Sequence, residues 1–99
     1  MSLTVSQGET QTFSQVNRLS VYPNPAHSIV NQKITSDITG TVQINIYNMS
    51  GKLVATAQTE KTSDVLYNKI GISQLAPGMY TIQVNIANQK TLVSKFIKY

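Results

Sequence analysis

Hydrophobic and polar residues alternate in short runs along most of the chain. The clearest run spans residues 41–47, where Val42, Ile44 and Ile46 point one way and the residues between them are polar. Residues 80–86 repeat the pattern with a second set of apolar side chains. A period of two is that of an extended strand with one buried face. Both segments are therefore predicted to be half-buried β-strands.

Further segments of this kind bring the prediction to about seven strands. They are residues 19–22, 28–35, 41–47, 52–59, 64–72, 80–86 and 91–99. No helical period of useful length appears between them. Short strands with turn signals about every 8–12 residues are typical of an immunoglobulin-like antiparallel β-sandwich. The detailed topology stays open, because the Cys…Trp…Cys pattern of true immunoglobulin domains is missing.

The alternation also predicts which side chains face the core. Leu53, Ala55 and Ala57 should share the inward face of their strand, and residues 60–63 should form a polar loop after it. Tyr80 lies in phase with the apolar residues that follow it. It is predicted to be a core residue with its hydroxyl at the rim.

The composition fits one small β-domain. The 99 residues (10.9 kDa) are 40% hydrophobic and only 12% charged, which is too apolar for a disordered tail. The β-branched residues Ile, Val and Thr fill 30 positions (10, 9 and 11), as expected for a sheet protein. Cys and Trp are absent, and no apolar run approaches the roughly 18 residues of a membrane helix. The sequence thus predicts no disulfide framework, no thiolate metal site and no membrane span.

Groups that carry out chemistry are few. His27 is the single histidine, and its neighbour Ser28 would point to the opposite face of a strand, which disfavours a catalytic pair. The four carboxylates are scattered along the chain, at Glu9, Asp37, Glu60 and Asp64. The sequence therefore predicts a protein that is not an enzyme, with no catalytic, cofactor-binding or metal-binding residues.

The net charge is +4, and the eight basic residues are spread singly. They are Arg18, Lys33, Lys52, Lys61, Lys69, Lys90, Lys95 and Lys98. Nucleic-acid binders tend to cluster such residues and to interleave aromatic ones. Nucleic acid is therefore not an expected partner. The spread is typical of a solvated surface, and a weak attraction to an acidic surface is the alternative.

Residues 1–18 differ from the rest of the chain. They are rich in Ser, Thr and Gln, and they lack the basic start and apolar stretch of a secretory signal peptide. We expect a cloning scar at residues 1–3, then a flexible linker, with the packed domain at residues 19–99. A polar stretch before a packed domain suits a protease, so residues 4–18 are the candidate cleavage segment.

Four motifs follow one another within the predicted domain. They are Tyr-Pro-Asn-Pro-Ala at residues 22–26, Ile-Tyr-Asn-Met-Ser-Gly-Lys-Leu-Val at 46–54, Ile-Ser-Gln-Leu-Ala-Pro-Gly-Met-Tyr-Thr-Ile at 72–82 and Lys-Phe-Ile-Lys-Tyr at 95–99. Together, in this order, they resemble the C-terminal sorting domain of the type IX (Por) secretion system of Bacteroidota. The third motif matches the family's Leu-x-x-Gly-x-Tyr core, and the fourth matches its basic, apolar final strand. Tyr99 departs from the pattern, since the family more often ends on a basic or small residue.

The resemblance implies a non-catalytic signal domain at the end of a larger cargo protein. The cargo would enter the periplasm by a separate signal peptide, and the secretion machinery at the outer membrane would recognise the folded domain. A sortase-like cysteine peptidase would cut in the linker before the domain, and the cargo would be joined to an anionic lipopolysaccharide or released. The expected destination is the cell surface or the extracellular space. The resemblance implies no cofactor and no small-molecule substrate.

The motif residues are the candidate sorting signal. They are Pro23, Asn24, Pro25, Gly51, Leu75, Gly78, Tyr80, Lys95 and Lys98. Several also have a structural explanation, because prolines end an edge strand, Gly51 suits a hairpin loop and Pro77 with Gly78 suits a type II turn. Lys95 and Lys98 are expected to project outward from the final strand. The machinery would then read these lysines or the exposed edge of that strand.

An accessory binding module of a secreted multidomain enzyme is the alternative function. Its ligand would be a carbohydrate or another protein. Such sandwiches usually display Trp or Tyr platforms, and this chain has no Trp and five Tyr. Export of a fused cargo by a working type IX system would distinguish the two functions.

Overall fold

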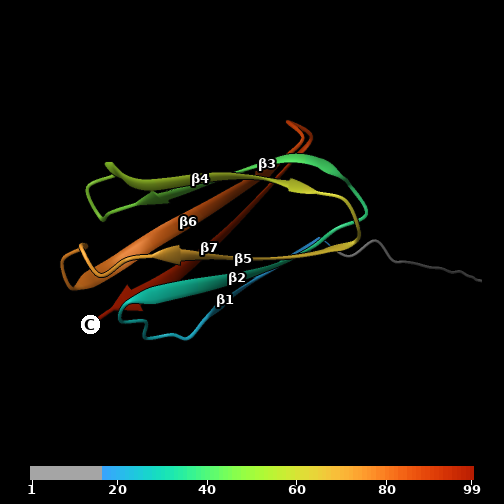
Figure 1. Ribbon diagram of the computed structural model, residues 1–99. Helices are drawn as coiled ribbons and strands as arrows, with labels where there is room; N and C mark the ends of the chain where they lie inside the picture. The colour runs from blue at the N-terminus through green and yellow to red at the C-terminus, as the bar shows by residue number, and fades with distance from the viewer. Residues whose placement is uncertain (1–16) are drawn as a thin grey trace, which may run out of the picture.

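Two antiparallel sheets, packed face to face, make up the domain (Figure 1). The structure is a computed structural model and describes residues 17–99. Its seven strands are β1 (Arg18–Tyr22), β2 (Ile29–Thr35), β3 (Gly40–Tyr47), β4 (Leu53–Lys61), β5 (Val65–Gly71), β6 (Gly78–Ile86) and β7 (Lys90–Lys98). The strand orders of the two sheets are β1-β2-β5 and β4-β3-β6-β7. The predicted strands and the immunoglobulin-like β-sandwich class are confirmed.

The core lies between the sheets, on the inward faces of β2, β3 and β6. Val42, Ile44 and Ile46 are completely buried, as the alternation predicts. The rings of Tyr80 and Phe96 stack at a centroid distance of 5.5 Å in the same cluster. Full burial of one Val or Ile side chain contributes roughly 1.5–3 kcal/mol. A slip of one residue would turn a whole strand's apolar set toward water, so the burial also fixes the strand register.

Strand direction divides the loops between the two ends of the sandwich. The odd-numbered strands all run the same way, toward the left in Figure 1. The end that they reach is here called the C-terminal end, and it comprises residues 23–28, 48–52, 72–77 and 99. The opposite end comprises residues 36–39, 62–64 and 87–89. The described chain enters β1 from this opposite end (Figure 1). No helix in residues 17–99 is long and apolar enough to cross a membrane.

A β-bulge in β4 changes which of its residues face the core. Tyr47 pairs with Leu53 while Ile46 pairs with Ala55, which leaves Val54 as the extra residue. The prediction that Leu53 shares the inward face of Ala55 is wrong, because the bulge shifts the alternation by one position. Leu53 is 48% exposed, and Val54 packs against the core in its place.

A buried lysine links two loops at the opposite end. The prediction of a polar loop over residues 60–63 is wrong in part, because β4 continues to Lys61. Only 1% of the Lys61 surface is exposed. Its Nζ donates hydrogen bonds to the carbonyl oxygens of Ser36 and Ser63, each at 2.5 Å. One ammonium group thus connects the β2–β3 loop to the β4–β5 loop.

Candidate recognition surface at the C-terminal end

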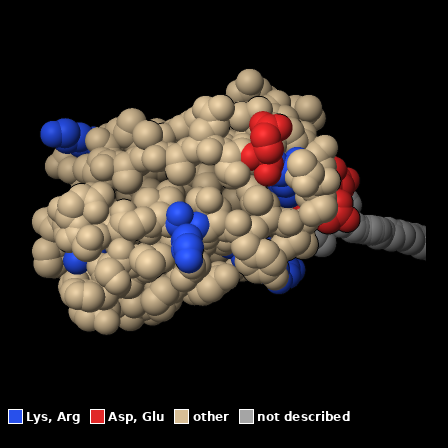
Figure 2. Space-filling view, viewed as in Figure 1, with Lys and Arg blue, Asp and Glu red and all other residues tan. Residues whose placement is uncertain are grey.

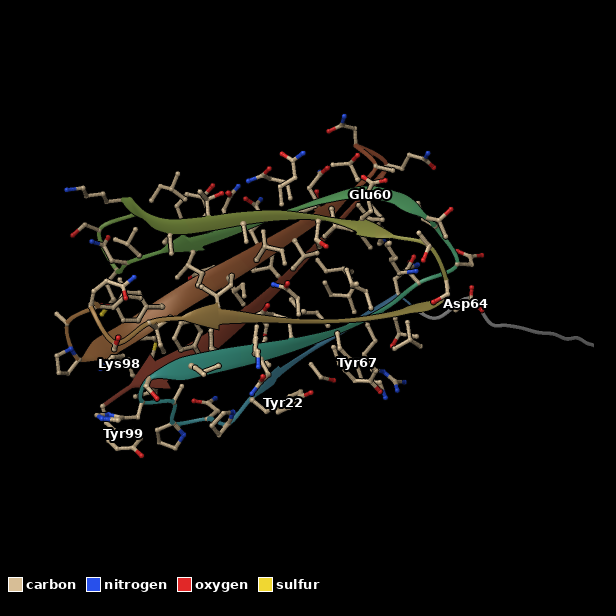
Figure 3. All side chains as sticks on the ribbon, in the orientation of Figure 1. Tyr22, Glu60, Asp64, Tyr67, Lys98 and Tyr99 are labelled. Atoms are coloured by element: carbon tan, nitrogen blue, oxygen red, sulfur yellow. The ribbon has the colours of Figure 1, made fainter. Side chains whose placement is uncertain are left out.

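The four motifs are far apart in the sequence but meet at the C-terminal end. Residues 22–26 form most of the β1–β2 loop, and residues 95–99 end β7. The second and third motifs contribute the β3–β4 hairpin and the β5–β6 loop, which together line a shallow depression of about 260 Å³. Figure 3 shows Lys98 and Tyr99 of the fourth motif at this same end. The sequence predicted the four motifs but not their contact with one another.

The segment around Asn24 holds the end of the last strand. The N–H of Ala26 donates to the Ile97 carbonyl at 2.7 Å, and the N–H of Tyr99 donates to the Ala26 carbonyl at 3.0 Å. Asn24 Oδ1 accepts a hydrogen bond from the N–H of Ile97 at 2.9 Å. These four residues, Asn24, Ala26, Ile97 and Tyr99, are here called the clamp. The expectation of a free edge on the final strand is wrong at this position, because the clamp occupies it.

The two prolines flank the asparagine of the clamp. Pro23 and Pro25 are exposed, and both are preceded by cis peptide bonds. Ala26, which follows them, is completely buried. The loop therefore presents two proline rings to solvent. Ala26, the next residue, forms a parallel β-bridge with Lys98.

The two lysines of the fourth motif have different surroundings. Lys95 is exposed, whereas Lys98 lies on the inward face of β7 with Phe96 and is only 6% exposed. The expectation that both project outward is wrong for Lys98, because residues three apart on a strand lie on opposite faces. Lys98 Nζ donates to the Tyr99 carbonyl at 2.9 Å, and His27 Nδ1 lies 3.0 Å from the same oxygen. Lys98 thus supports the clamp from inside.

Four other candidates shape the loops beside the clamp. Gly51 has a φ of 83°, which favours glycine in the β3–β4 hairpin. Tyr80 lies in the core as predicted, and its hydroxyl donates to the Ala76 carbonyl at 2.5 Å. Leu75 packs against the core. The prediction of a type II turn is wrong, because Gly78 has a φ of 156° instead of roughly 80°. These residues set the shape of the surface.

An apolar patch lies beside these loops on the outer face of the four-stranded sheet. Its members, between 43% and 81% exposed, are Met49, Leu53, Met79, Val93 and Ile97. Met79 pairs directly with Ile97, and Met79 and Met49 line a depression of about 410 Å³. Gly51 and Lys95, two of the sorting candidates, line the same depression. Motif reading missed this patch, although Val93 and Ile97 occupy outward positions that the alternation defines.

The chemistry available at this surface is that of binding. Within residues 17–99, no three His, Asp or Glu side chains are placed to hold a metal ion. The ring of His27 stacks on Tyr99 at a centroid distance of 4.9 Å. The exposed ammonium group of Lys95 lies beside the flexible apolar side chains of Met49 and Met79. This combination suits a partner that is itself partly apolar and acidic.

A family model described as the secretion system C-terminal sorting domain matches residues 20–99. The chain belongs to this family, so the resemblance carried by the four motifs is confirmed. The domain is a C-terminal sorting signal for type IX secretion, and its family is non-catalytic. Its cargo is secreted to the cell surface or the extracellular space.

A solved structure shares the fold. Dimeric latent PorU from Porphyromonas gingivalis is similar at 20% identity with a TM-score of 0.62, over 90% of this chain and 10% of that one. A β-glucosidase from Listeria innocua in complex with glucose is similar at 14% identity with a TM-score of 0.45, over 85% of this chain and 16% of that one. No curated protein matches the chain. The chain thus spans about a tenth of the PorU chain.

Proposed function

We propose that the C-terminal end of this sorting domain is the surface read by the type IX machinery at the outer membrane, after the cargo has crossed the periplasm. The observation that carries the proposal is the meeting of all four motifs at one end of the sandwich. Motifs that served only local turns could fall at either end of the sandwich. A shared surface is what a single receptor requires.

The candidate residues divide into two roles in this proposal. Lys95 and the apolar patch contact the machinery, since they are exposed, and Lys95, Met49 and Met79 share a depression with Gly51. Pro23 and Pro25 border the same end and are exposed as well. Asn24, Leu75, Gly78, Tyr80 and Lys98 position the loops and the last strand. A buried ammonium group such as that of Lys98 is out of reach of a partner until the clamp opens.

The linker has a separate role in the proposal. Residues 4–18 join the cargo to the domain at 19–99, and a sortase-like cysteine peptidase cuts within them. Residues 4–16 lie outside the described part of the chain. The described chain enters β1 at the end opposite the motifs (Figure 1). A cut before β1 therefore releases the cargo without disturbing the recognition surface. The chain itself performs no catalysis in this scheme.

An export assay tests the recognition surface. The whole chain is fused behind a fluorescent protein with a periplasmic signal peptide, in a bacterium with a working type IX system and in a strain lacking its translocon. We expect Lys95→Glu to lower export at least about fivefold, the equivalent of ~1 kcal/mol in binding. Met79→Ser should act in the same direction, because it removes apolar surface from the same depression.

Lys90→Glu is the matched control, since it makes the same charge change at the other end of β7. It should export like the unmodified fusion. Circular dichroism of each purified variant confirms that the sandwich has formed. Normal export of folded Lys95→Glu and Met79→Ser would overturn the assignment of the surface. Mass spectrometry of the exported product locates the cut, and a cut inside residues 19–99 would overturn the proposed linker role.

A further inference from the structure

The outer face of the three-stranded sheet carries a second surface, here called the tyrosine face. Its large polar and aromatic outward side chains are Arg18, Tyr22, Asn31, Lys33, Tyr67 and Lys69, which share this face with the apolar Ile29 and Val65. Three of these six are cations and none is a carboxylate. Glu60 and Asp64 lie at the opposite end of the sandwich (Figure 3), where the acidic side chains also gather in Figure 2. The tyrosine face is therefore attractive to anions.

A groove runs along the tyrosine face toward the C-terminal end. One part, of about 460 Å³, lies between Tyr22 and Tyr67 and is lined by Asn31 and Lys69 as well. A second part, of about 310 Å³, shares Asn31 and Lys69 with the first and extends to Tyr99. Figure 3 shows Tyr67, Tyr22 and Tyr99 in succession along this side of the molecule. The groove is thus long, shallow and bordered by aromatic rings.

Strand register fixes the spacing of these groups. Tyr22 pairs with Asn31, which pairs with Lys69, while Tyr67 pairs with Lys33 in the next outward row. Two strand spacings and two residues separate the Cα atoms of the two tyrosines, a distance of about 12 Å. Lys33 Nζ lies 6.0 Å from the centroid of the Tyr67 ring, within the range of a cation–π contact. Cations, amides and aromatic planes therefore alternate along the groove.

We propose that this groove binds an acidic polysaccharide, a chain of sugars that carries carboxylate or sulfate groups. A tyrosine ring packs on the apolar face of a sugar, and its hydroxyl reaches the sugar hydroxyls. The Asn31 amide, which already donates to the Tyr22 carbonyl at 3.2 Å, is held on the same face. Lys33 and Lys69 supply charge-assisted hydrogen bonds to the acidic groups. Of the sorting candidates only Pro23 lines the groove, in its second part, and the tyrosines, Asn31 and the two lysines are not among them, so the role goes beyond sorting.

Two other anionic polymers fit the groove less well. Strand addition by an acidic peptide would take place at a sheet edge, β1 or β5, and would leave the groove over the central strand β2 unfilled. Nucleic acid would be attracted by the same charges and rings. Secretion places the domain at the cell surface or outside the cell, where polysaccharides are abundant. An acidic polysaccharide is therefore the favoured occupant.

An NMR titration of the whole chain tests this inference. Oligogalacturonate is the acidic probe, and its methyl-esterified form is the matched neutral probe. We expect amide shifts confined to the neighbourhood of Tyr22, Asn31, Tyr67 and Lys69 with the acidic probe only. Tyr67→Ser and Lys69→Gln should each weaken binding at least about threefold, the effect of losing one aromatic or charged contact. Lys95→Gln, on the other sheet, should bind as the unmodified chain does.

Several outcomes would overturn the inference. They are the absence of binding, equal binding of the neutral probe, and shifts that map to the apolar patch. Binding of oligoglutamate or of a single-stranded oligonucleotide as tightly as oligogalacturonate would replace a saccharide site with a general anion surface. Export of the Tyr67→Ser and Lys69→Gln fusions, measured in parallel, should be normal. This keeps the inference separate from the sorting surface.

Discussion

The two ends of the sandwich are held together in different ways. At the opposite end, Lys61 is 1% exposed, and its ammonium group donates hydrogen bonds to carbonyl oxygens of two loops. At the C-terminal end, the buried Lys98 lies beneath the clamp, but the last strand is tied through Asn24 and Ala26, and Asn24 is itself exposed. The Lys61 ammonium group is therefore inaccessible to a binding partner. Asn24 is accessible to a partner while its side chain still bonds to the last strand.

This difference separates stability from recognition within one small domain. A buried cation is costly to desolvate, so its bonds matter to the fold and to nothing outside it. Exposed hydrogen bonds contribute less to folding, because water competes for both partners. We therefore expect substitutions at the opposite end to act on stability and substitutions at the C-terminal end to act on export.

Lys61→Met should have the largest effect on stability. The methionine side chain has no N–H to donate, so the carbonyl oxygens of Ser36 and Ser63 lose their hydrogen-bond donor. We expect the free energy of unfolding to fall by about 1–3 kcal/mol. Urea denaturation followed by circular dichroism measures the loss, with the exposed Lys52→Met as the control. Unchanged stability would mean that removing the buried charge offsets the lost bonds, and the contrast between the ends would disappear.

Asn24→Ala should have an intermediate and more local effect. It removes the acceptor of the Ile97 N–H, which we expect to lower the free energy of unfolding by about 1 kcal/mol. Hydrogen exchange should become faster at the amides of Ile97 and Tyr99 before it changes in β3. Asn24→Asp keeps an acceptor oxygen and should preserve their protection. Equally rapid exchange in the Asp variant would show that this hydrogen bond does not hold the strand.

Met49→Ser should have the smallest effect on stability. The side chain is 81% exposed at the tip of the β3–β4 hairpin, so the free energy of unfolding should change by less than about 0.5 kcal/mol. Export of the fluorescent fusion should nevertheless fall, because the depression beside Lys95 loses one of its apolar walls. A destabilisation as large as that of Lys61→Met would show that the patch belongs to the fold and not to recognition.

The alternation of side chains was sufficient to predict the strands and most of the core. Val42, Ile44 and Ile46 obey a strict period of two, and a period of two has one structural solution when a buried face is available. The prediction failed at Leu53, because a bulge adds one residue to one partner only. Nothing in the sequence of β4 alone marks that insertion, since it depends on how β3 and β4 pair.

The candidate site was less predictable than the fold. Lys61 and Lys98 look like surface residues in the sequence, yet both are buried. Lys61 Nζ donates to the Ser36 carbonyl, 25 positions away, and the segment at Ala26 pairs beside Lys98. Such neighbours come from loops far away in the sequence, and no local pattern records them. The motifs identified the right segments. The hydrogen bonds that join these segments, and the outward side chains around them, came only from the three-dimensional arrangement.

The clamp also bears on the stage of folding at which the recognition surface is complete. Asn24 and Ile97 are 73 positions apart, and the bond between them closes a loop that contains five strands. Contacts of this separation appear late, because the chain must close a long loop to make them. Under the proposed assignment, a partly folded domain presents no complete surface to the secretion machinery. The machinery would then select finished molecules, and the domain would act as a checkpoint on its own folding.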